Sequence, residues 1–289
     1  MRLHFIGVGK MGLPMALHLR AGSAGLSVSD RDPVRLALAA DQGLTVAADT
    51  ALALQQADAV FSSLPHDAAL LAVAEQVAAQ AKPGTFWVDT STVSPTASAT
   101  AAHMCAAAGI EHVRTTVSGN NKMAEAAQLT VLASGPRNTY DQVLPLLRCW
   151  GPNQFYLGEA EQARLMKLVI NLMIAQTSAM LGEALTLGRK GGLDWHDMWR
   201  VMGASAVASP IVKAKSAQLS ERDFSATFTV NQMVKDLDLI LGAASEHQVP
   251  LPQTALTRQL MDAARAHGDA EADYAAIIKA VERSAGLPT

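Results

Sequence analysis

Short runs rich in apolar residues alternate with helical patterns from the amino terminus to about residue 160. Each run is bounded by turn-forming residues and therefore predicts a strand. The predicted strands are Leu3–Ile6, Leu26–Ser29, Ala59–Ser62, Thr85–Val88 and Thr130–Ala133. Helices are expected at 11–20, 33–40, 66–81 and 95–108, the second with Asp32 as its N-cap. Because alternating strands and helices are joined by right-handed crossovers, we expect a mostly parallel sheet whose carboxyl-end loops line one crevice.

After about residue 160 the strand signals stop and helical patterns continue to the end of the chain. A long helix is predicted from Ala163 to Lys190, where Gly191 and Gly192 end it. Further helices are predicted from Trp195 after an Asp194 cap, and over 228–247 and 254–267. The chain thus predicts an α/β domain of the Rossmann type over residues 1–162, followed by an all-α domain over 163–289.

The long helix is apolar nearly all round, so we expect other helices or a second subunit to enclose it. It carries Lys167, Asn171, Gln176 and Glu183. These polar residues favour a buried helix over one that faces lipid, and no membrane partner is expected.

Composition narrows the class of protein further. The chain is 49% hydrophobic and 17% charged, with a net charge of −3, which argues against a surface that binds nucleic acid. Cys105 and Cys149 are the only cysteines and do not form a metal-ligand spacing, so no metal is expected. They are interpreted as reduced thiols of a cytoplasmic protein.

A glycine pattern directly follows the first predicted strand. Gly7, Gly9 and Gly12 form a G-x-G-x-x-G loop that also contains Lys10 and Met11, and a predicted helix begins there. Such a loop allows a tight turn, close approach of backbone amides to a pyrophosphate, and close packing of helix on strand. The positive end of the helix then points toward the phosphates. We therefore predict a dinucleotide site.

The end of the second predicted strand bears on cofactor choice. Asp30 can accept hydrogen bonds from the adenosine ribose hydroxyls and would repel a 2′-phosphate, whereas the neighbouring Arg31 could attract one. Asp32 adds a second negative charge. NAD is favoured and NADP stays possible, and the alternative is that these residues only form a turn.

Two more loops close strands on the expected cofactor side. Leu64 and Pro65 end one strand, and Ser91 and Thr92 follow another. Pro65 suits a loop that lies against a ring, and Thr92 could hydrogen-bond the ribose or the nicotinamide amide. Taken alone, each is more often a strand-ending turn.

Lys167 and Asn171 lie four residues apart on the long helix and share one face. Burial in so apolar a stretch would lower the pKa of a lysine toward the range useful for proton transfer. Asn171 could orient a substrate hydroxyl or the amine. The alternative is a lysine whose stem covers apolar surface while its charge reaches solvent.

Two further features suggest a substrate or cofactor contact less strongly. Ser118, Gly119, Asn120 and Lys122 belong to a small polar loop whose amides would suit a carboxylate, although an ordinary capped loop fits equally well. By spacing alone, Lys235 and Asp236 fit a solvated charge on an amphipathic helix, with Phe228 one heptad before Lys235.

Together these motifs resemble the β-hydroxyacid dehydrogenase family, which includes 3-hydroxyisobutyrate dehydrogenase and tartronate semialdehyde reductase. The resemblance covers nearly the whole chain and keeps the family's order. It rests on 7–16, Leu64-Pro65, 89–95, Val117-Ser118-Gly119, Gly158 with Lys167 and Asn171, and Phe228 with Lys235-Asp236-Leu237. It implies that Lys167 is the general acid/base, that Ser118 and Gly119 hold the substrate carboxylate, and that Phe228 and Lys235 contact the cofactor.

The chain departs from the family pattern where the substrate is expected. Arg114-Thr115-Thr116 replaces the usual Asp-Ala-Pro, Asn120-Asn121-Lys122 replaces a glycine and small residues, and Ile170 replaces the first of two asparagines. The cofactor frame is therefore kept while the substrate frame is altered. We hypothesise a hydroxy acid other than 3-hydroxyisobutyrate, more polar or with an extra hydroxyl or anionic group that Asn120 or Lys122 can meet.

The resulting expectation is an oxidoreductase that moves a hydride between NAD(P) and a small β-hydroxy acid or its semialdehyde. An imine-reductase-like enzyme is one alternative, which Lys167 disfavours because related imine reductases usually carry another residue there. A non-enzymatic dinucleotide-binding or interaction protein is the other. The apolar long helix suggests a homodimer or homotetramer.

Overall fold

The computed structural model describes residues 1–21 and 25–289. The chain divides into two compact units, Met1–Lys167 and Leu168–Thr289, whereas the sequence predicted a boundary after residue 162. Each unit is described by itself.

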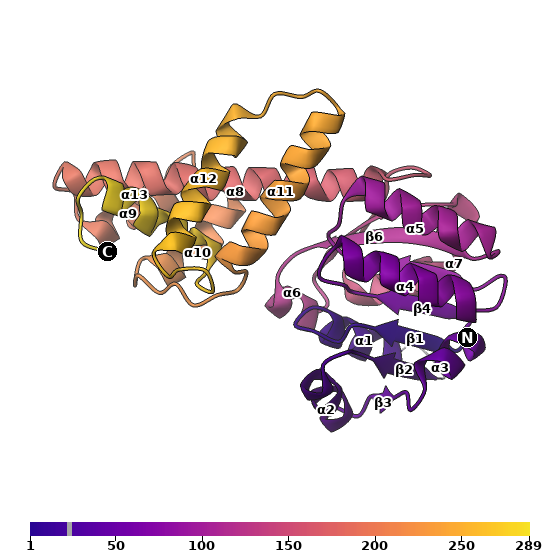
Figure 1. The fold of residues 1–289 in the computed structure, drawn as a ribbon. Helices are drawn as coiled ribbons and strands as arrows, with labels where there is room; N and C mark the ends of the chain where they lie inside the picture. The colour runs from indigo at the N-terminus through magenta and orange to yellow at the C-terminus, as the bar shows by residue number, and fades with distance from the viewer. Residues whose placement is uncertain (22–24) are drawn as a thin grey trace. The chain divides into compact units, whose positions relative to one another are not determined.

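The first unit is built on a sheet, which has eight strands in its described part, in the order β3-β2-β1-β4-β5-β6-β7-β8 (Figure 1). All neighbouring strands run parallel except β6 and β7. The mostly parallel α/β sheet that the sequence predicted is thereby confirmed. Its strands are β1 Leu3–Ile6, β2 Leu26–Ser29, β3 Thr45–Val46, β4 Ala59–Ser62, β5 Phe86–Asp89, β6 Glu111–Ser118, β7 Thr130–Ser134 and β8 Asn153–Tyr156.

Pairing register brings the ends of the central strands together. Ile6 of β1 pairs with Ser29 of β2 and with Ser62 of β4, and Ser62 pairs with Asp89 of β5. The loops that follow these strands therefore share one edge of the sheet, as expected for a dinucleotide-binding crevice.

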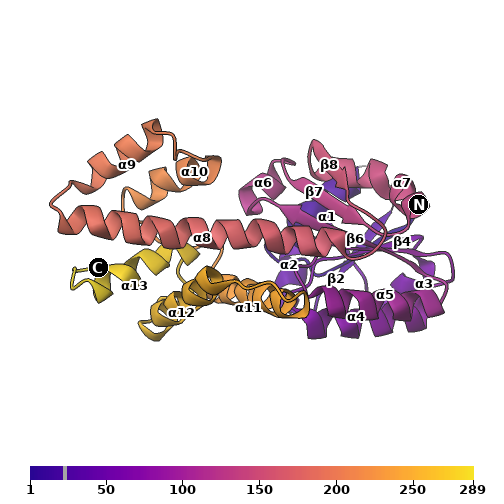
Figure 2. The same ribbon diagram turned by 90° about the horizontal axis from the view of Figure 1, so that it is seen from above.

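Helices cover both faces of this sheet (Figure 2). One apolar core joins α1 and α7 to the sheet through Leu19, Phe61 and Leu147, and a second joins α4 and α5 through Leu70 and Trp87. Asp32 caps α2 by accepting a hydrogen bond from Val34 N, as predicted. The helices are α1 Gly12–Ala21, α2 Pro33–Asp41, α3 Thr50–Gln56, α4 Asp67–Gln80, α5 Pro95–Ala107, α6 Asn121–Glu125 and α7 Arg137–Leu147.

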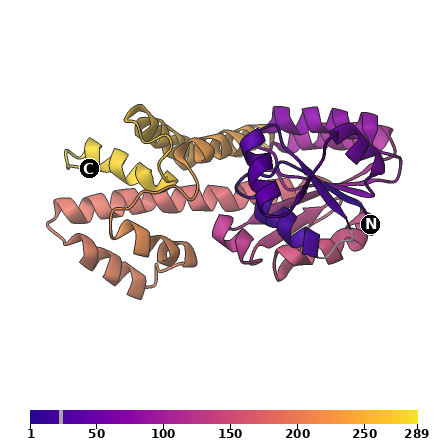
Figure 3. The same cartoon turned by 90° about the horizontal axis from the view of Figure 1, so that it is seen from below.

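The second unit is helical, as predicted. Its long helix α8, Gln162–Lys190, begins in the first unit. Within the second unit, α9 and α10 lie on one side of α8, and α11 to α13 lie on the other (Figures 2 and 3). The remaining helices are α9 Trp195–Ala204, α10 Pro210–Leu219, α11 Val230–Glu246, α12 Pro252–Ala266 and α13 Ile277–Ser284.

Within this single chain, α8 keeps an exposed apolar stripe. Leu168 and Ala175 are buried against α11 and α12, whereas Met173 is 65% exposed and Leu187 is 75% exposed. By length and composition alone α8 could also cross a membrane, but 44% of its most apolar window is buried within the protein. Among the described residues, the other helices therefore enclose α8 on only part of its surface.

Candidate active site

The glycine loop lies where β1 meets α1, and its glycines have different roles. A Cβ on Gly7 would lie 2.4 Å from Ser63 O, and one on Gly12 would lie 1.9 Å from Gly7 O. Gly7 also has a φ of 90°, which favours glycine. A Cβ on Gly9 would meet no protein atom within 4 Å. Gly7 and Gly12 are therefore required by the turn itself, and Gly9 leaves open space above the backbone, which fits a dinucleotide phosphate.

Asp30 braces this loop against the end of β2. One carboxylate oxygen accepts from Val8 N at 2.8 Å and the other from Asp32 N at 2.9 Å. Arg31, Lys10 and Asp32 are exposed beside it. Asp30, the residue predicted to bind the ribose, is thus held in place by the glycine loop. Each of its carboxylate oxygens can still accept a second hydrogen bond.

The two further cofactor loops are joined to each other. Leu64 N donates to Ser91 Oγ at 2.8 Å, and Ser91 Oγ donates to Asp89 at 2.7 Å. Pro65 is exposed and Thr92 is half-buried in the same loops. The structure therefore brings these residues to the sheet edge that carries the glycine loop.

The predicted substrate loop is more open. Ser118 ends β6, Gly119 has a φ of 141°, and Asn120 Oδ1 caps α6 by accepting from Met123 N at 3.0 Å. Asn120 and Lys122 are exposed. The asparagine oxygen thus has a structural role, and both side chains are exposed to solvent.

Lys167 lies in the second turn of α8 and is half-buried, so it is neither deeply enclosed nor on the open face of the helix. Leu165 and Met166 beside it are exposed, whereas Arg164, three residues earlier, is completely buried. An amine at this depth can reach a bound substrate and still exchange a proton with solvent.

Asn171 is one helical turn after Lys167 and is 5% exposed. Its Nδ2 donates to Asp236 Oδ2 of α11 at 2.5 Å, and Lys235 Nζ pairs with Asp236 Oδ1 at 2.9 Å. A carboxylate only accepts hydrogen bonds, so this contact fixes the amide with its oxygen directed away from Asp236. The interpretation of Asp236 as a solvated charge is wrong, because its side chain is 1% exposed.

Phe228 lies just before α11. Its ring packs against Tyr274 with centroids 6.2 Å apart, and it is half-buried. The next residue, Thr229, caps the helix that carries Lys235. Phe228 therefore lies just before the helix that carries Lys235.

Sequence reasoning missed a set of side chains that attach the start of α8 to the sheet. Arg114 Nη2 pairs with Glu161 at 2.5 Å, Thr116 Oγ1 donates to Ala163 O at 3.0 Å, and Arg164 pairs with Asp89 at 2.5 Å. The departure at Arg114–Thr116 thus serves to anchor the helix. The signal available in the sequence was Arg164, a charge at the start of the apolar long helix.

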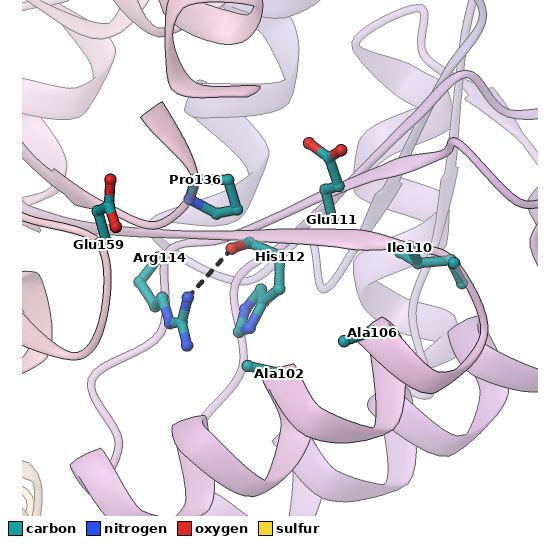
Figure 4. A pocket seen from close by; sticks show the side chains of 9 residues that line it. Ala102, Ala106, Ile110, Glu111, His112, Arg114, Pro136 and Glu159 are labelled. Atoms are coloured by element: carbon teal, nitrogen blue, oxygen red, sulfur yellow. Dashed lines mark hydrogen bonds between the residues drawn. The ribbon is translucent and has the colours of Figure 1, made fainter. Parts of the chain in front are cut away.

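A cavity of about 370 Å³ lies elsewhere on the first unit, between α5, the amino-terminal half of β6 and the loops after β7 and β8 (Figure 4). His112 and Arg114 line it, and burial lowers the pKa of His112 well below its usual value, which leaves that imidazole neutral. Since Ser118 ends the same strand at its other end, this cavity is not the predicted substrate loop. No cluster of potential metal ligands occurs among the described residues.

Comparison with known proteins identifies the family of this chain. Residues 2–158 match the family model of the NAD binding domain of 6-phosphogluconate dehydrogenase, and residues 162–281 match that of the NAD-binding region of NADP-dependent 3-hydroxyisobutyrate dehydrogenase. The chain belongs to the β-hydroxyacid dehydrogenase family. As a member, it is an oxidoreductase that uses a nicotinamide dinucleotide.

Two curated relatives and one solved structure illustrate the likeness. The chain is 32% identical to 2-(hydroxymethyl)glutarate dehydrogenase of Eubacterium barkeri, over 99% of this chain and 96% of the relative. It is 27% identical to 2-hydroxy-3-oxopropionate reductase of Escherichia coli, over 98% and 97%. The structure of Mycobacterium tuberculosis 3-hydroxyisobutyrate dehydrogenase with L-serine has a TM-score of 0.88 and 25% identity, over 96% of this chain and 99% of that one.

Proposed function

We propose that this dehydrogenase interconverts a small β-hydroxy acid and its semialdehyde, with Lys167 as general acid/base. The observation that carries the proposal is the half-buried Lys167, one turn before an Asn171 whose amide is fixed by Asp236. During oxidation the neutral amine takes the hydroxyl proton, and during reduction the ammonium returns it to the carbonyl oxygen. The bound nicotinamide accepts or supplies the hydride.

The residues around the lysine have positioning roles in this proposal. Ser118 and Gly119 hold the substrate carboxylate through hydroxyl and backbone donors, and the amide nitrogen of exposed Asn120 adds a donor. Asn171 presents its oxygen to the lysine or to the substrate hydroxyl. Phe228, just before α11, and Lys235, on α11, contact the cofactor.

We propose a substrate with a second polar or anionic group. Lys122 is an exposed cation of the substrate loop, in a stretch where the family usually has small residues. The relative from Eubacterium barkeri is named for a substrate that is a β-hydroxy acid with a second carboxylate. A dicarboxylate of this type would place one carboxylate at Ser118 and the other near Lys122.

NAD is the proposed cofactor, with NADP as the alternative. Asp30 is fixed at the end of β2 by Val8 N, and a 2′-phosphate would meet this carboxylate and that of Asp32. Exposed Arg31 is the group that would favour NADP.

The experiment follows absorbance of the reduced nicotinamide with a panel of β-hydroxy acids, their semialdehydes and cyclic imines, each with NAD and with NADP. Turnover of hydroxy acids supports the proposal. Turnover of imines alone favours an imine-reductase-like enzyme. The presence of Lys167 argues against that alternative. Cofactor binding without turnover of any substrate favours a binding protein.

We further propose a cytoplasmic homodimer or homotetramer in which a second copy covers the exposed stripe of α8. Met173, Met180 and Leu187 of this stripe are each more than half exposed. Light scattering coupled to size exclusion measures the assembly, and Met173→Glu is expected to dissociate it. A monomeric wild-type protein would contradict the proposal.

A further inference from the structure

The first turn of α8 contains an arginine whose side chain is completely buried. Arg164 Nη2 donates to Asp89 Oδ2 at 2.5 Å, Nη1 donates to Ser91 O at 2.5 Å, and Nε donates to Ser98 Oγ at 3.1 Å. These three acceptors lie at the end of β5, in the loop after it, and on α5. One side chain thus connects α8 with the loop that contains Thr92.

Asp89 extends this connection to the second cofactor loop. It also accepts from Ser62 Oγ at 2.5 Å, at the end of β4, and from Ser91 Oγ at 2.7 Å. Ser91 Oγ in turn accepts from Leu64 N at 2.8 Å. A single buried network therefore joins both cofactor loops to the first turn of α8.

A buried ion pair such as Arg164–Asp89 contributes little net stability to a fold. Removing two charges from water is costly, and well-packed apolar side chains of similar volume often stabilise a core as well. The charged hydrogen bonds of an arginine are, however, directional and specify one geometry. The network is therefore better explained by the position it enforces than by the stability it provides.

The residue whose position this network fixes is Lys167. An α-helix is rigid over one turn, so the residue three positions after Arg164 follows any movement of that turn. Just before α8, Arg114 holds Glu161 at 2.5 Å and Ser134 Oγ donates to Ala160 O at 2.6 Å. The start of α8 is thus held by several side-chain contacts, and those of Arg164 connect it with the cofactor loops.

We propose that Arg164 is a positioning residue that sets the placement of the Lys167 amine relative to the cofactor loop at 89–92. This inference rests on the proposed role of Lys167 as general acid/base. An error of about 1 Å in the placement of a catalytic group can cost about a hundredfold in rate, so the effect belongs to kcat.

Arg164→Lys tests this role, because it keeps the charge but cannot reach all three acceptors at once. We expect kcat to fall about thirtyfold to a hundredfold. The cofactor Kd, measured by calorimetry without turnover, and the KM for the hydroxy acid should change by no more than about twofold to threefold. Arg189→Lys is the matched control, because it alters an arginine on the same helix that pairs with buried Glu282. It should lower the melting temperature and leave kcat unchanged.

A second variant guards against misfolding. Arg164→Gln combined with Asp89→Asn removes both buried charges together, so neither is left unpaired. It should reproduce the loss of kcat with circular dichroism like that of the wild type. A fall in kcat no larger than that of Arg189→Lys, or one explained by weaker cofactor binding, would overturn the proposal.

The Lys167→Ala background separates this proposal from the one on which it rests. If Arg164 acts through Lys167, adding Arg164→Lys to Lys167→Ala should lower kcat by less than about threefold. An undiminished effect in that background would refute the positioning role and leave the acid/base assignment intact. Near-normal turnover of Lys167→Ala alone would refute both.

Discussion

The cofactor loops and the substrate loop of the first unit are held in very different ways. Gly7, Asp30, Leu64 and Ser91 are fixed by a turn that only glycine fits and by buried or half-buried hydrogen bonds. The loop after Ser118 is exposed, and among its side chains Asn120 makes a local cap. A rigid cofactor frame beside a loosely held substrate loop allows specificity to change without disturbing hydride transfer. The substitutions at Asn120–Lys122 fall in the part that can vary.

The largest expected effect on the cofactor loops comes from substitution of two of their glycines. Gly12→Ala places a Cβ 1.9 Å from Gly7 O, so the turn must move and cofactor affinity should fall by about a hundredfold or more. Gly9→Ala meets no protein atom within 4 Å, so its melting temperature should equal that of the wild type while the cofactor Kd rises about tenfold. Calorimetry and thermal denaturation measure both, with Gly242→Ala as control. Unchanged binding by Gly9→Ala would show that no phosphate approaches this loop.

Acid should weaken the sheet beneath the glycine loop. His4 of β1 is fully buried between Ser27 and Ser29, and burial lowers its pKa to about 4. The unfolded chain binds this proton near pH 6.5, so stability is complete above that pH and falls as the pH drops toward 4. The loss is at most about 3 kcal/mol.

Urea denaturation at pH 7 and pH 4.5 measures this effect. His4→Gln should reduce the pH dependence, whereas the exposed His103→Gln should keep it. Equal pH dependence in wild type and His4→Gln would contradict the assignment.

A smaller effect is expected in the substrate loop. Lys122→Ala should raise KM about fivefold to tenfold for dicarboxylic hydroxy acids, and should leave KM for monocarboxylic ones and the melting temperature unchanged. Lys213→Ala, another exposed lysine, serves as control. If the ranking of substrates stays the same, Lys122 does not determine specificity.

The smallest effect concerns the cysteines. Burial raises the pKa of Cys105 to about 12 and that of Cys149 to about 11. Both thiols should therefore stay protonated at pH 8 and react with a thiol reagent only after unfolding. Rapid labelling of the native enzyme would show that the first unit opens more readily than its contacts indicate.

The alternation of apolar runs was sufficient to predict the central strands and the change to helices. It missed β6, since His112, Arg114 and Thr116 make that strand look polar although all three are buried. It also missed the short β3 and the half-exposed β8, which lie at the two edges of the sheet. Hydropathy records the chemistry of a side chain and not the partner that makes burial possible.

The candidate site likewise contains residues that local sequence predicts and residues that it does not. The glycine loop and its neighbours follow local spacing, so their placement could be predicted from the sequence. Asp236 and Arg164 depend on partners 65 and 75 residues away, at Asn171 and Asp89. Such contacts are set by packing of helices and loops, which no local pattern records.

The central claim is that Lys167 transfers the proton in this dehydrogenase. Lys167→Ala should bind the cofactor within about twofold of the wild type and lose about a hundredfold to ten-thousandfold in kcat with its best hydroxy acid. Single-turnover absorbance of the reduced nicotinamide, on protein of verified fold, measures the step directly. A rate close to that of the wild type would contradict the account.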